Sequence, residues 1–491
     1  MEALTLLLIF LISCILCLYT WNSMYRNHNL PPGPTPLPFL GNLLKMKTGQ
    51  MVDSLKELQK KYGDVYTIYL GPRRVVVLCG YEAVKEALVD NAEEFGDRGL
   101  LPSIELYTQG HGLVFSNGER WKELRRFTIK TFRHFGMGKR SIDEKIKEEA
   151  KCLVEEFRKR KGEPFNPTFY FSQVAANITC AILFGSRYSY NDPAFLRLMY
   201  IIDEIFKAMS SFWGQLFDIF NAVMKHFPGP HHRAAKFAYK LDKFALERLE
   251  AERDTLDPEN PRHMIDSFLM KMEEEKDNPS NSYTMKSVLT CTSILFIAGT
   301  ETVSTTLRHG FLLLLKHPDI KCKVQEEIDR VIGRHRDPEP EDRASMPYTD
   351  AVIHEIQRYA NVLPMNLPHA VMKDVKFRGF SIPKGTDVLP ILAFVLHDPK
   401  YFPDPFIFNP RRFLDENGGF EKNAAFMAFS AGKRVCLGEN LARVELFIFI
   451  TTLLQHFDIS TPEDPAHIDI TPQMVGFSNV PKSYLISFNP R

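Results

Sequence analysis

The chain lacks the paired cysteine spacings that mark a disulfide framework or a zinc site. Its eight cysteines are scattered along 491 residues, and only Cys14 and Cys17 stand close together, inside an apolar run. No Cys-x-x-Cys pair meets a second pair or two spaced histidines, so a structural zinc is not expected. Scattered cysteines favour reduced thiols and a cytosolic environment.

A charge excess, low-complexity tracts and internal repeats are also missing. The formal net charge is only +1, which argues against nucleic acid as a partner. No Gly/Ser linker and no fixed-period repeat divides the chain. Since 44% of the residues are hydrophobic, a large core can form. We expect one large domain behind an N-terminal anchor.

Residues 3–21 form an uncharged apolar run, long enough to cross a bilayer as a helix. A cleavable signal needs a basic start and a small-residue cleavage site, whereas Glu2 precedes this run. We therefore expect a retained single-pass anchor. Arg26 follows the run and no basic residue precedes it, which places the bulk of the protein on the cytosolic side. A cleaved signal peptide is the alternative. It would imply a secreted protein that is poor in disulfides, which disagrees with the cysteine pattern.

A proline-rich spacer over residues 22–41 separates the anchor from the main domain, residues 42–491. Its segment 30–38 holds five prolines in nine residues, which excludes helix and favours a stiff extended chain. The asparagine of the sequon at 177–179 is expected to stay unmodified in the cytosol.

The pattern of the main domain predicts a mainly α fold with small β-sheets. Two strands, 65–70 and 74–78, are joined by a Gly-Pro turn and are expected to form a β-hairpin. Helical periodicity covers the segments 81–90, 119–133, 142–161, 236–254, 285–316 and 321–333. Within the longest of these, 289–307 carries one charge, Glu301, and eight serines and threonines. That polarity suits a core helix beside a cavity better than a second membrane span.

The segment from Phe429 to Gly438 presents one cysteine, Cys436, in a glycine-framed turn before a helix-like run. A helix start would offer backbone N–H groups and a favourable dipole to a thiolate. Gly432 and Gly438 lack side chains where a flat cofactor approaches. The guanidinium of Arg434 offers paired N–H donors that suit a carboxylate.

This Phe-x-x-Gly-x-Arg-x-Cys-x-Gly pattern resembles the haem-ligand signature of the cytochrome P450 family. The resemblance extends over essentially the whole chain and is nearest to family 2, the vertebrate microsomal oxidisers. It implies the cytochrome P450 fold, haem b as cofactor and Cys436 as the axial ligand of its iron. One departure is Ala428, where many relatives have proline.

Ala298-Gly299-Thr300-Glu301-Thr302 resembles the oxygen-activating motif of the same family. Gly299 and Thr302 fall on one helix face, and a hydroxyl and a carboxylate there could relay the protons that O–O cleavage needs. By resemblance Thr302 and Glu301 are the catalytic residues. A core helix whose hydroxyls bond to its own backbone is the alternative.

Glu355 and Arg358 match the family's Glu-x-x-Arg pair, which occurs six times in the chain and means little alone. Only Glu355 is followed at the family's distance by a proline-aromatic block, whose Arg412 completes a triad. Its expected role is structural, a buried pair satisfied by a third charged group.

The two haem propionates need cations or donors in a partly buried site. The resemblance assigns this role to Arg98, Trp121, Arg125, His369 and Arg434. It adds the cofactor contacts Ala298, Phe429, Gly432 and Gly438.

Between Arg120 and Arg140 stand eight basic residues and one acid, a local charge of +7. Such asymmetry indicates an acidic partner. By resemblance the partner is NADPH-cytochrome P450 reductase, with cytochrome b5 as a second candidate. Anionic lipid and a merely solvated helix are the alternatives. The expected docking residues are Lys122, Arg126, Arg133, Lys139, Lys433 and Arg443.

Because the chain contains no nicotinamide fingerprint or phosphate-binding loop, NADPH is expected to act through that reductase. The implied activity is monooxygenation of apolar substrates, hydroxylation or epoxidation of xenobiotics, steroids or fatty acids, at the endoplasmic reticulum membrane. Pocket walls are expected from 102–115, 206–217, 294–302, 362–367 and Phe477. Two alternatives remain, a peroxide isomerase of the same fold and a haem carrier or sensor.

Overall fold

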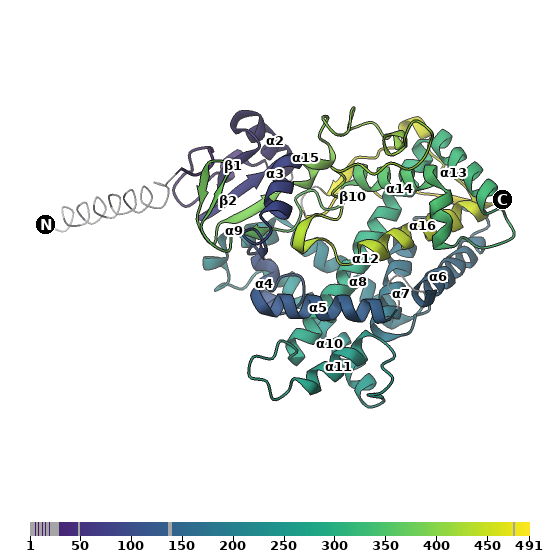
Figure 1. The fold of residues 1–491 in the computed structure, drawn as a ribbon, viewed down its shortest axis with the longest axis horizontal. Coiled ribbons are helices and arrows are strands. Elements are labelled where there is room, and N and C mark those ends of the chain that lie inside the picture. The colour runs from purple at the N-terminus through teal and green to yellow at the C-terminus, as the bar shows by residue number, and fades with distance from the viewer. Residues whose placement is uncertain are drawn as a thin grey trace.

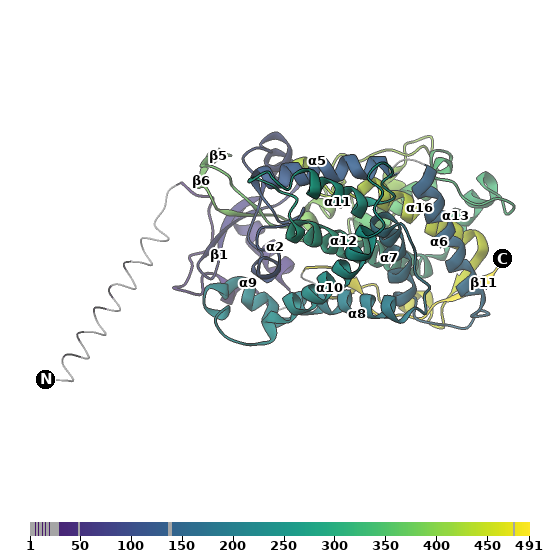
Figure 2. The ribbon, with the colours of Figure 1, turned by 90° about the horizontal axis from the view of Figure 1, so that it is seen from below.

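The computed structural model describes residues 29–47, 50–135, 140–474 and 477–491, with Thr5, Leu8, Ile12, Ile15 and Tyr19. Most of the expected anchor, 3–21, and part of the expected spacer lie outside the described residues. Figures 1 and 2 show a helical part, which makes up most of the domain, and a smaller sheet part at one end. The mainly α fold with small sheets is confirmed.

The helices are α2 (Met51–Tyr62), α3 (Tyr81–Lys85), α4 (Pro102–Thr108), α5 (Gly118–His134), α6 (Arg140–Arg158), α7 (Thr168–Phe184), α8 (Pro193–Ser210), α9 (Phe212–Met224), α10 (Arg233–Arg253), α11 (Met264–Glu274), α12 (Met285–Lys316), α13 (Pro318–Val331), α14 (Pro347–Ala360), α15 (Leu392–Leu396) and α16 (Glu439–His456). The expected helix 142–161 ends earlier, at Arg158. Lys161 and Gly162 have φ of 51° and 80°, so the chain leaves the helical region there.

The strands are β1 (Val65–Leu70), β2 (Arg73–Leu78), β3 (Asp97–Arg98), β4 (His369–Ala370), β5 (Val375–Phe377), β6 (Phe380–Ile382), β7 (Asp387–Pro390), β8 (Phe457–Ser460), β9 (Pro472–Met474), β10 (Val480–Pro481) and β11 (Ser487–Pro490). β1 and β2 form the predicted hairpin, with Val65 opposite Leu78. They belong to a five-stranded sheet of order β1-β2-β7-β4-β3. This order brings Arg98 and His369, distant in sequence, opposite each other.

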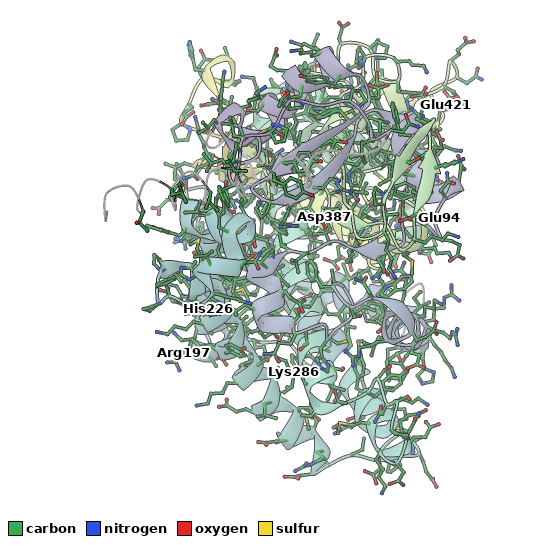
Figure 3. All side chains as sticks on the ribbon, turned by 90° about the vertical axis from the view of Figure 1, so that its left-hand side faces the viewer. Glu94, Arg197, His226, Lys286, Asp387 and Glu421 are labelled. Atoms are coloured by element: carbon green, nitrogen blue, oxygen red, sulfur yellow. The ribbon has the colours of Figure 1, made fainter. Side chains whose placement is uncertain are left out.

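One arginine on the sheet, Arg73, bonds both a neighbouring strand and helix α9. Arg73 on β2 bonds Asp387 on β7 at 2.6 Å, and the same guanidinium donates to the carbonyl of Asp218 on α9 at 2.7 Å. Figure 3, viewed from the sheet end, shows Asp387 in the sheet part and Lys286, at the start of α12, in the helical part. Arg73 therefore links β2 to β7 within the sheet and connects the sheet to α9.

The predicted core helix is α12, and its bounds agree with the expected range 285–316. It packs against α7, α10, α14 and α16, and Leu307, Phe311 and Leu314 on it are fully buried. In the part of the chain that the structure describes, α12 alone is long and apolar enough to span a membrane. Its apolar window is 61% buried inside the protein, as expected of a core helix.

Candidate active site

A cavity of about 290 Å³ lies beside α12 and contains most of the predicted site residues. Its wall is formed by parts of α5, α12, α14 and α16 and by two connecting segments, 361–367 and 428–438. The predicted residues that line it are Arg98, Trp121, Arg125, Ala298, Thr302, Phe429, Arg434, Cys436 and Gly438. Residues that are far apart in sequence therefore line one cavity.

Cys436 is the one cysteine among the residues that line the cavity, and its side chain is exposed to it. Its backbone N–H donates to the carbonyl of Phe429 at 3.0 Å, which closes the loop. Burial raises the pKa of the Cys436 thiol, while backbone N–H groups at Gly438 and Glu439 act in the opposite direction. The predicted helix start is present, because α16 begins at Glu439. A thiol held there is suited to bind a soft metal centre.

The two glycines of the loop act differently from each other. Gly432 has φ of 71°, and a Cβ there would lie 1.7 Å from the carbonyl oxygen of Leu88. It therefore lets two backbone segments meet and does not line the cavity. Gly438 does line the cavity, and a Cβ built on it meets nothing within 4 Å. The prediction that both make room for a flat cofactor is corrected for Gly432.

Three arginines in the cavity wall lack an acidic partner among the described residues. Arg125 donates to the carbonyl of Val435 at 2.8 Å, and Arg434 to those of Gly96 and Ser116. Nη1 of Arg434 is buried and has no hydrogen-bond partner among the described residues, although the guanidinium lies 3.7 Å from the centre of the Trp121 ring. Burial lowers the pKa of Arg98 to about 9 and that of Arg434 to about 8.

Arg98 and Arg434 are buried and Arg125 is half-buried, and a buried cation without an acidic partner is costly unless an anion enters. The cavity thus combines a thiol, apolar walls and cations that need carboxylates. This donor set fits haem with its two propionates. Cys436 would hold the iron, and Arg98, Arg125 and Arg434 would hold the carboxylates, with Trp121 beside them.

His369 lies behind Arg98 and does not line the cavity. Its Nδ1 donates to the carbonyl of Phe95 at 2.8 Å, so its Nε2 accepts from Nη1 of Arg98 at 2.9 Å. Burial and the charge of Arg98 lower the pKa of His369 to about 3, which keeps the ring neutral. His369 therefore orients Arg98, and its direct contact with the cofactor stays a prediction.

Asn117 was missed by sequence reasoning. Its Oδ1 accepts from the backbone N–H of Arg98 at 2.7 Å and from Nη2 of Arg434 at 2.8 Å. Its Nδ2 donates to the carbonyl of Arg98 at 3.0 Å. An asparagine before a helix normally indicates an N-cap, but this one makes no side-chain cap. It holds two of the three cations in place.

The predicted acid-threonine pair on α12 is divided between two sides of the helix. Thr302 lines the cavity, with its hydroxyl donating to the carbonyl of Ala298 at 2.8 Å. Glu301 does not line it, and its carboxyl accepts from the hydroxyl of Thr305 at 3.0 Å. A Cβ on Gly299 would lie 2.6 Å from Oγ1 of Thr179. Gly299 therefore allows α7 to approach α12, a second reason for the glycine besides room in the cavity.

The expected structural triad is assembled in the buried core. Arg358 donates to both oxygens of Glu355, at 2.7 and 2.8 Å, and Arg412 donates to the same carboxylate at 3.1 Å. The backbone N–H of Asn409 adds a further bond at 2.9 Å. Glu355 and Arg358 are fully buried, so this group joins α14 to the segment after Asn409.

The predicted docking charges differ in how freely they are exposed. Lys122, Arg126 and Arg133 follow one exposed face of α5. Lys433, also exposed, is paired with Glu93. Arg443 is half-buried, bonded to Glu439 at 2.8 Å, and its guanidinium lies over the ring of Phe429. Arg443 therefore has a structural contact, and Lys139 lies outside the described residues.

Part of the expected pocket wall lines this cavity. Its apolar surface includes Leu113, Leu295, Val362, Leu363 and Leu367, which come from three of the predicted segments. The segment 206–217 and Phe477 do not line it. Phe206 and Phe477 instead pack against each other, with ring centroids 6.1 Å apart.

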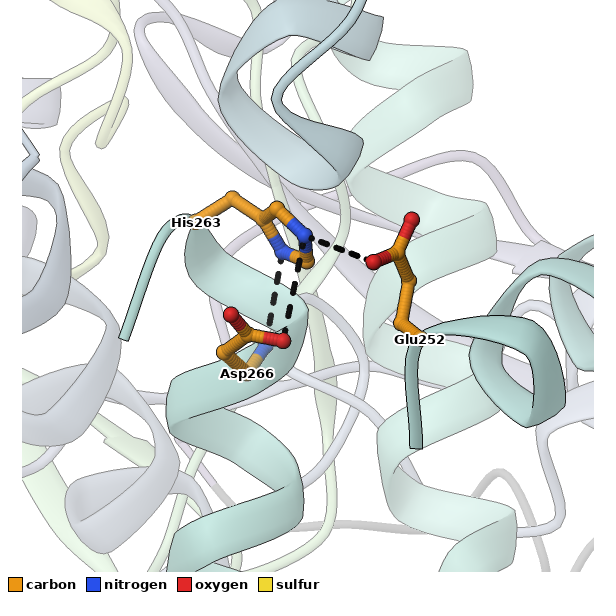
Figure 4. A group of neighbouring side chains, drawn as sticks. All are labelled: Glu252, His263 and Asp266. Carbon is orange, nitrogen blue, oxygen red and sulfur yellow. Dashed lines mark hydrogen bonds and ion pairs between the residues drawn. The ribbon is translucent and has the colours of Figure 1, made fainter. Parts of the chain in front are cut away.

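A second cluster, Glu252, His263 and Asp266, has metal-like spacing (Figure 4). Nε2 of His263 lies 3.2 Å from the Glu252 carboxylate. Arg262 binds both carboxylates, at 2.9 Å to Glu252 and 2.8 Å to Asp266. That guanidinium already supplies the positive charge, so the cluster is an ion-pair network that joins the end of α10 to the start of α11.

Comparisons with known proteins identify a family and several relatives that this chain resembles over almost its whole length. The family model described as Cytochrome P450 matches residues 31–488. Cytochrome P450 2G1 of Oryctolagus cuniculus is 52% identical over 482 residues, 98% of this chain and 98% of that protein. Cytochrome P450 2A5 of Mus musculus is 53% identical over 480 residues, 98% and 97% of the two chains. Cytochrome P450 2A13 of Homo sapiens is 51% identical over 494 residues, covering 100% of both.

Proposed function

The chain belongs to the cytochrome P450 family, whose members are haem monooxygenases, and from this we propose that it inserts one oxygen atom of O2 into apolar organic substrates. The observation that carries the proposal is the cavity that places the Cys436 thiol, three unpaired arginines and the Thr302 hydroxyl around one apolar space. Haem, when bound, supplies the redox chemistry that activates oxygen.

The remaining steps belong to the chain's own residues. Apolar side chains at Leu113, Leu295 and Leu363 exclude water and bind an apolar substrate. The Thr302 hydroxyl holds a proton or a water molecule at the α12 side of the cavity. The thiolate of Cys436 and the arginines Arg98, Arg125 and Arg434 would hold the cofactor.

Electrons are proposed to come from NADPH through NADPH-cytochrome P450 reductase, with cytochrome b5 as a second donor. The exposed face of α5 carries Lys122, Arg126 and Arg133 without a matching number of acids. Lys433, in the loop of Cys436, is also exposed. It lies near this face of α5, because Glu93 interacts with both Lys433 and Lys122. A cationic surface next to the thiol loop would attract an acidic partner.

The protein is proposed to be anchored by residues 3–21 in the endoplasmic reticulum membrane, with its catalytic domain in the cytosol. Support comes from exposed apolar side chains at the sheet end. Phe39 is 73% and Leu44 74% exposed, and on α9 Phe212 is 60% exposed. Ile219 of α9 lies against Gly71 between β1 and β2, so both groups lie at one end of the molecule (Figures 1 and 2). A membrane surface would cover them.

Product analysis with reconstituted reductase tests the proposal. Full-length protein loaded with haem would be given drugs, steroids and polyunsaturated fatty acids, with NADPH and O2. Oxygenated products that require both NADPH and the reductase are expected. Products formed from peroxides without reductase would indicate an isomerase, and haem binding without any product would indicate a carrier.

A further inference from the structure

Three described residues of the cavity wall, none of them glycine, have a backbone φ in the left-handed region. Asn361, with φ of 42°, ends α14, where such a residue commonly closes a helix. Asn366 and Ser430 have φ of 56° and 64° and end no helix. The left-handed conformation costs free energy in a residue with a side chain, and it persists only where the surrounding structure holds it. Asn366 and Ser430 therefore need a separate explanation.

Asn366 and Ser430 are joined by a side-chain hydrogen bond, although they are 64 positions apart in the chain. Nδ2 of Asn366 donates to Oγ of Ser430 at 2.9 Å. The backbone N–H of Leu367 donates to Oδ1 of the same amide at 2.8 Å. Because Oδ1 already accepts from an N–H group, the orientation of the amide is fixed and its nitrogen faces Ser430.

Each of the two residues closes a turn of the chain. The backbone N–H of Asn366 donates to the carbonyl of Leu363 at 3.1 Å, and that of Ser430 donates to the carbonyl of Met427 at 2.9 Å. The first turn lies in the wall segment, residues 362–367, which contributes apolar side chains to the cavity. The second turn leads into the loop of Cys436. The side-chain bond therefore joins the apolar wall of the cavity to the loop that carries the thiol.

The backbone on both sides of this contact is fixed by other parts of the chain. The carbonyl of Pro364 accepts from the N–H of Ala393 at 2.9 Å, and the carbonyl of Pro368 accepts from the N–H of Gly99 at 3.0 Å. Residues 365–367 lie between these two anchors. Among the described residues, the side-chain bond is the one hydrogen bond that ties 365–367 to a distant segment.

We propose that the Asn366–Ser430 hydrogen bond holds the wall segment 362–367 at a fixed separation from the Cys436 loop, and so limits the bulk of the molecule that the cavity accepts. Both residues are positioning residues, because the apolar surface itself comes from neighbours such as Leu367. The bond offsets part of the cost of two left-handed residues. The consequence for substrates rests on the proposed function, whereas the bond itself can be tested without turnover.

Binding of two imidazoles to the haem-loaded full-length protein tests this limit. A ring nitrogen of imidazole binds the iron on the side opposite the thiolate, and the absorbance change gives the dissociation constant. 4-Phenylimidazole makes the same bond but carries a phenyl ring that must fit beside the apolar wall. The ratio of the two dissociation constants therefore measures the space next to the iron, and it cancels effects on the haem itself.

Asn366→Gly and Ser430→Gly each remove the side-chain bond. Glycine adopts the left-handed conformation without strain, so we expect both variants to fold. The affinity for 4-phenylimidazole relative to imidazole should rise by about three- to tenfold in each, the factor that corresponds to one hydrogen bond. The double variant should show the same ratio as either single variant, because the two side chains act through one bond.

Lys161→Gly is the matched control. Lys161 also has a left-handed φ, 51°, but it does not line the cavity, so its ratio should equal that of the wild type. A ratio in Asn366→Gly or Ser430→Gly that stays at the wild-type value or falls would overturn the proposal. Two single effects that add in the double variant would also overturn it, because the residues would then act independently.

The proposed function and this inference fail in different ways. If the wild type forms no oxygenated product but the imidazole ratios change as expected, the positioning bond stands and the monooxygenase proposal is wrong. If product forms and the ratios do not change, the positioning bond is refuted and the monooxygenase proposal stands. Where product forms, the proportions of product isomers from one substrate should change in both single variants, and unchanged proportions would contradict the role in specificity.

Discussion

The two sides of the cavity hold their polar groups in opposite ways. On the side of the Cys436 loop, buried and half-buried arginines bond backbone carbonyls and asparagine, and none makes a salt bridge among the described residues. On the α12 side, the hydroxyls of Thr302 and Thr306 bond carbonyls of their own helix. The first side carries positive charge that no acidic side chain compensates among the described residues, and it is suited to a permanent anionic cofactor. The second is locally satisfied and is suited to water and changing substrates.

Removal of the thiol should have the largest effect. Cys436→Ala is expected to abolish the thiolate-type spectrum of the reduced carbon monoxide complex, because no other cysteine lines the cavity. The spectrum of the purified protein is the measurement. A mutant that kept this spectrum would show that another residue binds the iron, and the contrast between the two sides would fail.

The backbone under the cationic side is tested by Gly432→Ala. A residue other than glycine at φ of 71°, with Leu88 in contact, should lower the free energy of unfolding by more than the about 1–3 kcal/mol of a strained conformation alone. Denaturant unfolding with haem retention as the readout measures this. Gly418→Ala is the matched control, since Gly418 has φ of 80° but its Cβ would meet nothing within 4 Å. Equal losses in the two variants would contradict the assigned role of Gly432.

The α12 side is tested by Thr302→Ala. Because the hydroxyl bonds only its own helix and faces the cavity, haem content and substrate affinity should stay near normal. Hydrogen peroxide released per NADPH should rise, and a tenfold loss of productive partition corresponds to roughly 1.4 kcal/mol of differential barrier. Coupling equal to that of the wild type would make Thr302 a packing residue.

The smallest effect is expected outside the cavity, on the exposed face of α5. Arg126→Glu with Arg133→Glu should raise the reductase concentration for half-maximal turnover several-fold at low salt, with unchanged substrate-binding spectra. The effect should shrink as salt increases, because exposed charges are screened. Arg125, one residue from Arg126, faces inward, so a changed haem spectrum would indicate that the helix itself had been disturbed.

The sequence by itself determined the elements whose signals are local. The uninterrupted period of 285–316 predicted α12 residue for residue, and the alternation around Gly71 predicted the β1–β2 hairpin. The loop of Cys436 was recognisable because a ligand, two glycines and a helix start lie within ten residues. Glu355, Arg358 and Arg412 followed from spacing combined with resemblance, and the structure brings them together.

Only the tertiary structure decided which side of each element faces the cavity. Glu301 and Thr302 are neighbours in sequence, but a helix turns about 100° per residue, and packing against α7 aims only Thr302 at the cavity. Asn117 and His369 carry no local motif, since their roles depend on their bonds to Arg98 and Arg434, which come from distant segments. Gly432 is required by Leu88, which is more than 300 residues away along the chain. Contacts of such long range are created by the packing of the whole core, which no local pattern records.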